Sequence, residues 1–425
     1  MKALIPQPAK NLYHLVVAFF AAVWFRFPAR KLKIVGITGT DGKTTTVNLV
    51  YHILNSSGVK VGMISTVSAK IGEKTYETGF HVTTPSAFTI QKYLRKMVDE
   101  GTEYAVLEVT SHGLDQHRVA FIPFFIGLIT NITPEHLDYH RSFKNYVLAK
   151  AKILHKVKYR VLNAEESVFE KLKMMGSGQL VAFGGLNTDY FGEVVSSYDN
   201  LSNFAIHYKT KQKQLKTLVV QSNLIGEFNL LNILASFAVS KIFGLEDKKI
   251  INAISHFGGV EGRMQEISLG QAFKVYIDFA HTPKSIELAL ETLRKVTQKK
   301  LLVVFGAAGE RDPSKRVLMG QVAAQKADLI ILTAEDPRSE DPAKINSQIA
   351  KGIEKEGGKL NSKYWKVVDR SQAISQAIGN LAQEGDTVAI LGKGHEKTIN
   401  LAGKEYPWSD QAQVEKALKQ RLGQL

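Results

Sequence analysis

The chain has 425 residues, of which 44% are hydrophobic and 22% charged, so its composition is that of a soluble globular protein with two or three domains. It contains no cysteine, which excludes a disulfide framework, a cysteine zinc site and a thiol nucleophile, and fits a reducing, cytoplasmic compartment. The formal net charge of +15 suits nucleic acid, a membrane surface or an anionic substrate. Because the basic residues are spread along the chain and no nucleic-acid-reading module stands out, we interpret the charge as a solvated surface that attracts anionic substrates, with no nucleic-acid partner.

The most apolar run spans residues 15–25 and is flanked by six cations: Lys2, Lys10, Arg26, Arg30, Lys31 and Lys33. It is too short to cross a bilayer, which takes about 20 residues, and no small-residue cleavage site follows it. Two interpretations remain for the segment from 12 to 30: a helix packed on the next domain or a partner, or an interfacial helix on an anionic membrane. We favour packing.

From residue 33 onward, strand and helix patterns alternate. Strands are expected at 33–35, 59–64, 104–109 and 125–131, and helices at 47–54 and 88–99. This alternation predicts an α/β fold with a mostly parallel, doubly wound sheet that binds ligands at the carboxyl ends of its strands.

Residues 180–220 alternate in polarity, which predicts an antiparallel patch, and helices are expected at 229–243 and 248–257. A glycine-rich hinge at 258–262 precedes four further strands at 275–278, 301–305, 329–332 and 387–391, which predict a second, Rossmann-like α/β domain. The expected division is therefore a helical segment at 1–32, a central domain at 33–261 and a C-terminal domain at 262–425.

A glycine loop lies between the first strand and the first helix of that alternation. Strand, glycine turn and helix together form a cradle in which backbone N–H groups hold phosphates, while a lysine reaches the outer phosphates and a hydroxyl holds Mg²⁺. Ile37 stands where the usual pattern has its first glycine, and an ordinary turn is the alternative. The candidate phosphate-binding residues are Gly39, Thr40, Asp41, Gly42, Lys43, Thr44 and Thr45.

Two polar loops follow later strands. Glu108 ends a buried strand and is suited to Mg²⁺, which prefers oxygen ligands. His136 lies in a loop with His140 and two carboxylates; a zinc site would need a third nitrogen or sulfur ligand, so a magnesium or phosphate role fits better than zinc, and a simple polar loop is the alternative. Lys150 falls in a predicted helix and, taken alone, is a surface lysine.

These segments resemble the Mur ligase family, the ATP-dependent amide ligases of cell-wall precursor synthesis. The resemblance is carried in order along the chain by 39–45, 108–112, 136–140, 226–232, 262–264, 278–283, 305–316 and 392–396. Within the family, the chain is similar to the synthetases that add the third residue of the stem peptide.

The resemblance implies roles for individual residues. Lys43 would be catalytic, Thr44 and Glu108 would hold one Mg²⁺, and His136 and a carbamylated Lys150 would hold a second. Nucleotide contacts would come from Asn229, Asn232, Arg263, Asp278 and His281. Contacts to the acceptor would come from Thr83, Thr84 and Ser111.

The incoming amino acid would be bound by the second domain. The segment Glu335-Asp336-Pro337-Arg338 resembles the Asp-Asn-Pro-Arg motif of enzymes that add meso-diaminopimelate, although Glu335 and Asp336 depart from it. Lysine-adding members tend to lack the arginine, so diaminopimelate is favoured over L-lysine. Further contacts would come from Arg311, Gly392 and Glu396.

The implied reaction phosphorylates the carboxylate of a muramoyl-dipeptide-type acceptor with ATP, and an amine then attacks the acyl phosphate to give an amide, ADP and phosphate. The tripeptide synthetases carry a uridine-binding domain ahead of the phosphate loop, where this chain has about 35 residues. We therefore expect either that the central domain holds the acceptor alone, or that the acceptor is lipid-linked or otherwise not a UDP-sugar. A nucleotide-binding partner subunit without ligase chemistry is the other alternative, and a monomer is expected.

Overall fold

The computed structural model describes residues 7–76, 84–198, 201–210 and 212–425, and the chain divides into two compact units. Unit 1 runs from the N-terminus to Gly258, apart from short stretches around residue 198 and at 224–226 that belong to unit 2. Unit 2 continues from Gly259 to Leu425. The boundary falls in the glycine-rich segment.

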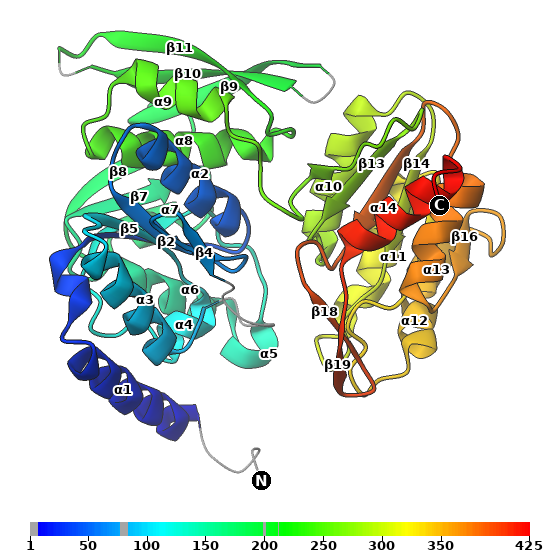
Figure 1. Cartoon of the computed structure of the whole chain (residues 1–425), viewed down its shortest axis with the longest axis horizontal. Coiled ribbons are helices and arrows are strands. Elements are labelled where there is room, and N and C mark those ends of the chain that lie inside the picture. The colour runs from blue at the N-terminus through cyan, green and yellow to red at the C-terminus, as the bar shows by residue number, and fades with distance from the viewer. Residues whose placement is uncertain (1–6, 77–83, 199–200, 211) are drawn as a thin grey trace. The chain divides into compact units, whose positions relative to one another are not determined.

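Unit 1 is built on a large sheet whose centre is parallel (Figure 1). In the part of the chain that the structure describes, its strand order is β11-β10-β9-β8-β7-β6-β1-β5-β2-β3-β4. Strand β1 pairs in parallel with β5 on one side and β6 on the other, so the ends of these three strands meet at one edge. The strands are β1 (Lys33–Thr38), β2 (Val61–Ile64), β3 (Ala69–Ile71), β4 (Lys74–Tyr76), β5 (Tyr104–Glu108), β6 (Phe124–Ile129), β7 (Tyr159–Asn163), β8 (Gln179–Gly184), β9 (Tyr190–Tyr198), β10 (Leu201–Lys209) and β11 (Leu215–Ser222).

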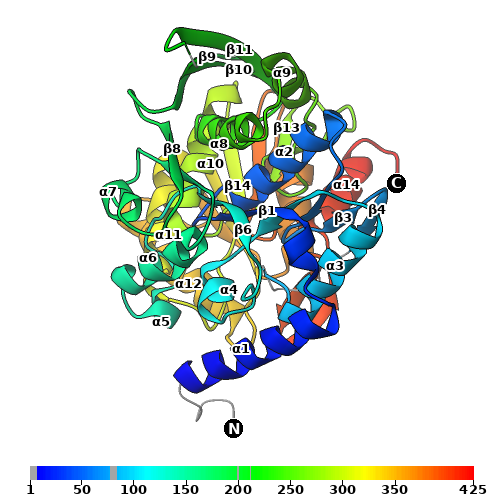
Figure 2. The same ribbon diagram turned by 90° about the vertical axis from the view of Figure 1, so that its left-hand side faces the viewer.

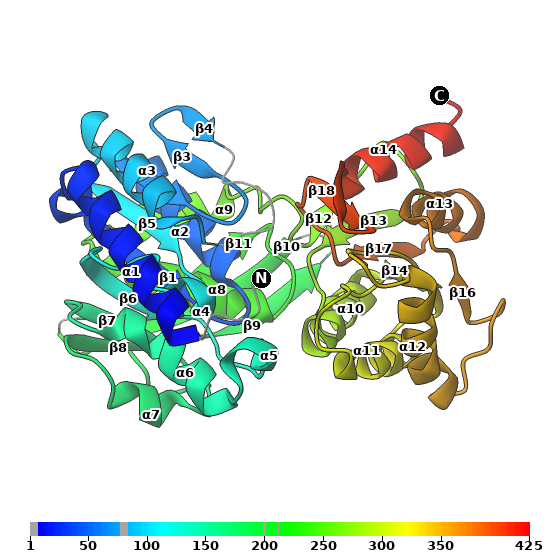
Figure 3. The same ribbon diagram turned by 90° about the horizontal axis from the view of Figure 1, so that it is seen from below.

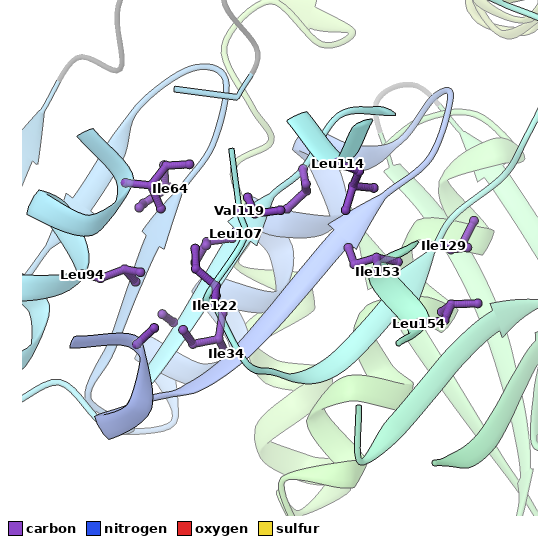
Figure 4. Packing of buried hydrophobic residues seen from close by; sticks show 14 of the residues in the cluster. Ile34, Ile64, Leu94, Leu107, Leu114, Val119, Ile122, Ile129, Ile153 and Leu154 are labelled. Carbon is purple, nitrogen blue, oxygen red and sulfur yellow. The ribbon is translucent and has the colours of Figure 1, made fainter. Parts of the chain in front are cut away.

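The central strands are buried on both faces because helices cover the sheet (Figure 2). Side chains from β1, β5, β6 and the surrounding helices form one core, in which Ile34, Leu107 and Ile129 are almost fully buried (Figure 4). The helices are α1 (Gln7–Trp24), η2 (Pro28–Lys31), α2 (Lys43–Ser56), α3 (Ala87–Asp99), α4 (Ser111–Asp115), α5 (Leu137–His140), α6 (Phe143–Ala151), η3 (Lys152–Leu154), α7 (Phe169–Lys173), α8 (Phe228–Ile242) and α9 (Asp247–Ser255).

The strand and helix predictions for unit 1 agree with the structure within a few residues, and the predicted α/β class is confirmed. The alternating region at 180–220 forms β8 to β11: β10 and β11 pair antiparallel, as expected, while β8 continues the parallel sheet beside β7.

Unit 2 has a smaller sheet with the order β12-β13-β17-β14-β15-β16, in which β13, β17, β14, β15 and β16 pair in parallel. Its strands are β12 (Gln265–Glu266), β13 (Lys274–Asp278), β14 (Leu301–Phe305), β15 (Leu329–Leu332), β16 (Tyr364–Lys366), β17 (Thr387–Leu391), β18 (Thr398–Leu401) and β19 (Lys404–Pro407). Its helices are α10 (Pro283–Val296), α11 (Ser314–Lys326), α12 (Pro342–Lys355), α13 (Arg370–Ser375), η4 (Gln376–Leu381) and α14 (Asp410–Arg421).

A buried ion pair joins α13 to α14 in unit 2. The Arg370 guanidinium donates to both carboxylate oxygens of Asp410, at 2.8 and 2.7 Å, and both side chains are almost inaccessible. The indole N–H of Trp408 also donates to Asp410, at 2.8 Å. With these partners, both charges of the pair are compensated inside the unit.

We expect Asp410→Asn to lower the free energy of unfolding of unit 2 by about 3 kcal/mol or more, because it leaves the Arg370 charge buried without a counter-ion. Urea unfolding followed by tryptophan fluorescence in a Trp24→Phe background reports on unit 2, since Trp365 and Trp408 both lie there. Glu291→Gln, which removes an exposed partner of Lys326, is the control and should cost less than about 1 kcal/mol. Equal losses in the two variants would contradict the buried-pair interpretation.

Helix α1 lies along the outside of unit 1 next to α3 (Figure 3). No helix within the described residues combines the length and the apolarity that a bilayer crossing needs. The helix turns into η2 through Arg26 and Phe27, both of which have a left-handed backbone, and η2 leads directly into β1.

Candidate active site

The glycine loop lies between the end of β1 and the start of α2, and it is held by the residues that follow β6. The side-chain oxygen of Asn131 accepts hydrogen bonds from the backbone N–H groups of Thr40 (3.0 Å) and Asp41 (2.8 Å). The Thr130 hydroxyl donates to the Asp41 carbonyl at 2.7 Å. The loop therefore has a fixed shape that rests on the neighbouring parallel strand.

Two glycines are required by this shape. A Cβ at Gly39 would lie 1.8 Å from the Thr130 hydroxyl, and one at Gly42 would lie 2.3 Å from the Asn232 side-chain oxygen. Gly42 also has a φ of 77°, which L side chains rarely adopt. The unusual spacing of the glycines thus follows from close contacts at 39 and 42.

The side chains that follow Gly42 suit a phosphate and a magnesium ion. The Lys43 ammonium is half-buried at the start of α2 and donates to the Thr40 carbonyl at 2.8 Å. The Thr44 hydroxyl donates to one oxygen of Glu108 at 3.0 Å, and the backbone N–H of Thr66 donates to the other at 2.9 Å. A hydroxyl and a carboxylate side by side fit Mg²⁺, which takes few protein oxygens and completes its shell with phosphates and water.

Lys150 is fully buried beneath the glycine loop, in contrast to a surface lysine. Its ammonium nitrogen donates to the Gly39 carbonyl at 2.5 Å and lies 4.6 Å from the centre of the Tyr146 ring. Burial, reinforced by the nearby Lys43 charge, lowers the pKa of Lys150 well below its ordinary value of 10.5. The site therefore disfavours the charged form of Lys150 relative to water.

The depth of Lys150 depends on two glycines in the sheet. Helix α6 continues into η3, whose Ile153 packs against β1 and β6. A Cβ on Gly127 of β6 would lie 2.5 Å from the Ile153 carbonyl oxygen, and one on Gly36 of β1 would lie 2.9 Å from the Ile153 side chain. The absence of side chains at 36 and 127 lets this segment approach the sheet.

We expect Lys150→Met to be more stable than the unchanged chain at pH 8 in CO₂-free buffer, because methionine fills the site without a charge to desolvate. In the unfolded chain Lys150 is protonated below pH 10.5, so folding releases a proton and stability rises with pH. The difference between the two proteins should shrink by up to about 1.4 kcal/mol per pH unit between the lowered pKa and 10.5.

Urea unfolding from pH 8 to 10 measures this difference. Lys144→Met, on the exposed side of the same helix, is the control and should show no such pH dependence. A pH-independent difference for Lys150→Met would show that the buried amine keeps its proton.

Three histidine rings gather beside the loop. The His112 ring centre lies 4.8 Å from that of His136 and 5.4 Å from that of His140. The His140 ring also contacts the Ser111 hydroxyl at 3.0 Å. The sequence placed His136 and His140 in one loop but did not reveal that His112 joins them. Among the described residues, no three or more histidine, aspartate or glutamate side chains are arranged so that they could hold a metal ion.

The predicted acceptor residues lie on both sides of the start of α4. The hydroxyls of Thr84 and Thr110 are 2.9 Å apart, and Thr110 caps α4, which begins with Ser111. Thr84 and Ser111 are both buried in unit 1. Thr83 lies outside the described residues.

Of the predicted nucleotide residues, Asn229 and Asn232 lie in unit 1 at the start of α8. The Asn232 amide donates to Asn229 at 2.8 Å, and its oxygen accepts from Thr46 of α2 at 3.2 Å. Both side chains are buried, and Asn232 reaches the glycine loop.

The other predicted nucleotide residues lie together in unit 2, at the end of β13. Asp278 accepts from the backbone N–H groups of Met264 (2.7 Å) and Ala280 (2.8 Å), and the Arg263 guanidinium lies 4.3 Å from the centre of the Phe279 ring. The His281 ring contacts the Phe279 carbonyl oxygen at 2.9 Å.

The predicted amino-acid site of unit 2 is a set of charges around a buried lysine. Lys393 is fully buried; it donates to Asp336 at 2.9 Å and also to Glu396. The backbone N–H of Asn400 donates to the same Asp336 oxygen at 2.9 Å. Arg338 follows with a left-handed backbone and pairs with β18 through Leu401. The carboxylate of Asp336 and the guanidinium of Arg338 therefore lie in one loop. A pair of opposite charges of this kind suits an amino acid, which carries both an ammonium and a carboxylate group.

Glu335 and Gly392 meet beneath that loop. A Cβ on Gly392 would lie 3.2 Å from the Glu335 carboxyl group, and Gly392 has a φ of 109°. Burial raises the pKa of Glu335. Beside them, burial and the Arg263 charge lower the pKa of His395 to about 3, so this imidazole is neutral at pH 7. Arg311 lies exposed in the loop after β14.

Some residues of these sites were not singled out from the sequence. Asn131 was visible only as a polar residue after a strand, and its bonds to the glycine loop depend on the pairing of β1 with β6. Lys393 lies in the segment 392–396, and nothing in the sequence indicated that this lysine is buried.

Comparison with known proteins identifies the same family that the sequence motifs resemble. Residues 37–240 match the model of the Mur ligase middle domain, and residues 262–394 match that of the Mur ligase, glutamate ligase domain. A Geobacillus kaustophilus protein named UDP-N-acetylmuramoyl-L-alanyl-D-glutamate–2,6-diaminopimelate ligase is 36% identical over 415 residues, covering 95% of this chain and 82% of that protein. A Roseiflexus UDP-N-acetylmuramyl-tripeptide synthetase is 35% identical, covering 97% and 84%.

A solved structure of a UDP-N-acetylmuramoyl-L-alanyl-D-glutamate–2,6-diaminopimelate ligase has a TM-score of 0.64 at 27% identity and covers 95% of this chain and 82% of its own. The folylpolyglutamate synthase of Mycobacterium tuberculosis shares the fold, with a TM-score of 0.70 at 14% identity, and covers 91% of this chain and 96% of its own. The two family models together match more than half of the chain, and the Geobacillus relative is 36% identical over nearly all of it, so this chain belongs to the Mur ligase family.

Proposed function

We propose that this chain is an ATP-dependent ligase that joins meso-diaminopimelate to a muramoyl-dipeptide-type precursor of the cell wall. The observation that carries the proposal is the buried Lys393, which pairs with the partly exposed Glu396 and with Asp336, two residues before Arg338. It occurs in a chain that is 36% identical to a protein named as a diaminopimelate ligase.

Unit 1 would supply the nucleotide and metal contacts. The loop from Gly39 to Thr45 would hold the phosphates of ATP, and Thr44 with Glu108 would hold Mg²⁺. The bound nucleotide would supply the phosphoryl group that activates the carboxylate of the acceptor as an acyl phosphate. Lys43 would neutralise the charge of that group, since phosphoryl transfer depends mainly on positioning and charge.

Lys150 and His136 would serve a second magnesium site. A neutral lysine amine adds to CO₂ and loses one proton, which yields a carbamate with a carboxylate-like charge. The lowered pKa of Lys150 increases the fraction of neutral amine, which is the form that carbamylation requires. A carbamate signal from ¹³C-labelled bicarbonate, present in the unchanged chain and absent in Lys150→Arg, is the expected result.

Unit 2 would select the amino acid. Diaminopimelate carries a second carboxylate that lysine lacks, and the planar guanidinium of Arg338 can bind such a group with two parallel hydrogen bonds. Asp336 and Glu396 would accept hydrogen bonds from an ammonium group. Diaminopimelate is therefore favoured over L-lysine.

The acceptor would contact Thr84 and Ser111, with Thr83 as a further candidate. The names of the relatives refer to UDP-linked muramoyl dipeptides, so a UDP-linked acceptor is proposed, with a lipid-linked form as the alternative. A monomeric, cytoplasmic enzyme, with domains at 33–261 and 262–425 after the N-terminal segment, completes the proposal.

ADP release measured with each combination of acceptor and amino acid tests this function. We expect release only when ATP, Mg²⁺, a muramoyl dipeptide and diaminopimelate are all present, with weaker release for lysine. UDP-linked and lipid-linked acceptors run in parallel identify the acceptor form. If ATP binds but no combination releases ADP, the chain is a nucleotide-binding partner and not a ligase.

A further inference from the structure

Helix α1 has its large apolar side chains on the outside. The side that faces unit 1 carries the small residues Ala18, Ala21 and Ala22, each at most 1% exposed. The outer side carries seven large apolar residues with exposed fractions from 45% to 75%: Leu12, Tyr13, Val16, Phe19, Phe20, Val23 and Trp24. A surface helix in water normally has the opposite arrangement, with its apolar stripe against the core.

This orientation is fixed by contacts on the inner side. Ala18 and Ala21 pack against Ala87 of α3. At the other end of the helix, the Gln7 amide donates to the Tyr139 hydroxyl at 2.7 Å, and the Asn11 amide donates to Asp115 at 3.2 Å. A rotation that buried the aromatic side would break these bonds, so the apolar side remains outward.

The exposed apolar surface extends beyond the helix. The Phe19 ring lies 5.6 Å from Phe121, and the Phe25 ring lies 6.0 Å from Phe88. Phe121 and Phe88 are each 42% exposed. The outer face of α1 and these two rings therefore form one contiguous patch, which we call the α1 face.

The N-terminal segment that contains α1 carries charge of one sign, while Asp115 and Glu103 of unit 1 lie near its two ends. The first 40 residues contain six cations and no aspartate or glutamate. Arg26, Arg30 and Lys31 follow the helix and are exposed. A cavity of about 390 Å³ beside them is lined by Arg30, Lys31 and Lys33, with Glu103 as the one carboxylate of its lining. An apolar strip with cations at its end complements a surface with an apolar interior and anionic headgroups.

We propose that the α1 face binds an anionic lipid bilayer, with the helix lying in the plane of the membrane surface. Because the inner side of α1 is packed on α3, only its outer side can enter the lipid, which gives an interfacial and not a spanning orientation. Tyr13 and Trp24 are residue types that favour this boundary. A second copy of the chain is the less suitable occupant, since a symmetric pairing of two α1 faces would bring like charges together. The proposal is independent of the ligase reaction.

Vesicle flotation with the full chain tests the proposal. Vesicles of phosphatidylcholine with about a third phosphatidylglycerol should carry the protein upward, and pure phosphatidylcholine should not. The double variant Phe20→Glu/Trp24→Glu should reduce the bound fraction at least about tenfold, because it places two charges where the lipid contact lies. The matched control is Met174→Glu/Leu186→Glu, which changes two apolar residues that are 83% and 81% exposed elsewhere in unit 1 and should leave binding unchanged.

A second variant tests the charges separately. Arg26→Gln/Arg30→Gln/Lys31→Gln should weaken binding to the anionic vesicles, and so should raising the salt concentration, because both reduce the attraction to the headgroups. Equal binding to neutral and anionic vesicles, or unchanged binding of the Phe20/Trp24 variant, would overturn the proposal. A dimer in sedimentation that the Phe20/Trp24 variant abolishes would also overturn it, because a second copy would then cover the α1 face.

Discussion

Replacing Lys43 by alanine is expected to lower kcat/KM for ADP formation by about 100- to 1000-fold, because one preorganised positive donor is removed from the transferring phosphoryl group. The fold should be unaffected, since the half-buried Lys43 side chain makes a single hydrogen bond, to the Thr40 carbonyl, among those described. Steady-state ADP release with saturating acceptor and amino acid is the measurement, with the melting temperature as a check on folding.

The control for this variant is Lys144→Ala, which removes an exposed lysine from α6 and should leave turnover unchanged. Lys43→Arg should retain part of the activity, because the charge remains while the compact ammonium is lost. Full activity in Lys43→Ala would show that the glycine loop does not hold the reacting phosphate, and the proposed roles of Thr44 and Glu108 would lose their support.

Replacing Arg338 by alanine is expected to raise KM for diaminopimelate at least about 30-fold, which corresponds to about 2 kcal/mol, the lower end of the cost of removing one partner of a buried charge pair. KM for ATP should stay the same, because Arg338 follows β15 and is not one of the predicted nucleotide residues, which in unit 2 lie at the end of β13. The ratio of kcat/KM for diaminopimelate to kcat/KM for lysine should fall, because lysine lacks the second carboxylate and so makes no such contact with Arg338.

Arg338→Lys is the informative companion variant. Lysine and arginine both carry a Cβ, so the backbone strain of this left-handed position is the same in the two proteins. The substitution replaces only the planar guanidinium by an ammonium group. Arg294→Ala, which removes an exposed partner of Asp328 from unit 2, should have no effect on either amino acid. Equal changes in KM for diaminopimelate and lysine would show that Arg338 does not read the second carboxylate.

Most of the fold could be predicted from the sequence, because the period of the apolar residues and the glycine turns are local signals. The parallel pairing of β1 with β5 and β6 agrees with the predicted parallel sheet, and the helix predicted at 47–54 is present but longer, from Lys43 to Ser56. Membership of the Mur ligase family was also predictable, since many short segments match in order, and it is confirmed.

Residue environments were less predictable, because they depend on contacts between distant segments. Lys150 looks like a surface lysine in the sequence, and its burial comes from the glycine loop that lies 111 positions earlier. Hydrophobicity favoured packing of residues 15–25 on the next domain, and α1 does pack on α3, but its alanines face inward while its aromatic residues face outward. The predicted roles of the site residues remain predictions.

The two strand glycines beneath η3 set a limit on how this sequence can vary. Positions 36 and 127 lie in strands where Val, Ile and Leu are the usual residues, yet any side chain there would push Ile153 outward and carry Lys150 with it. In a library that samples every residue at both positions, survivors selected for ligase activity should be almost all glycine, while survivors selected for folding alone should include alanine. Two positions inside sheet strands would thus vary as little as the residues proposed to contact substrate.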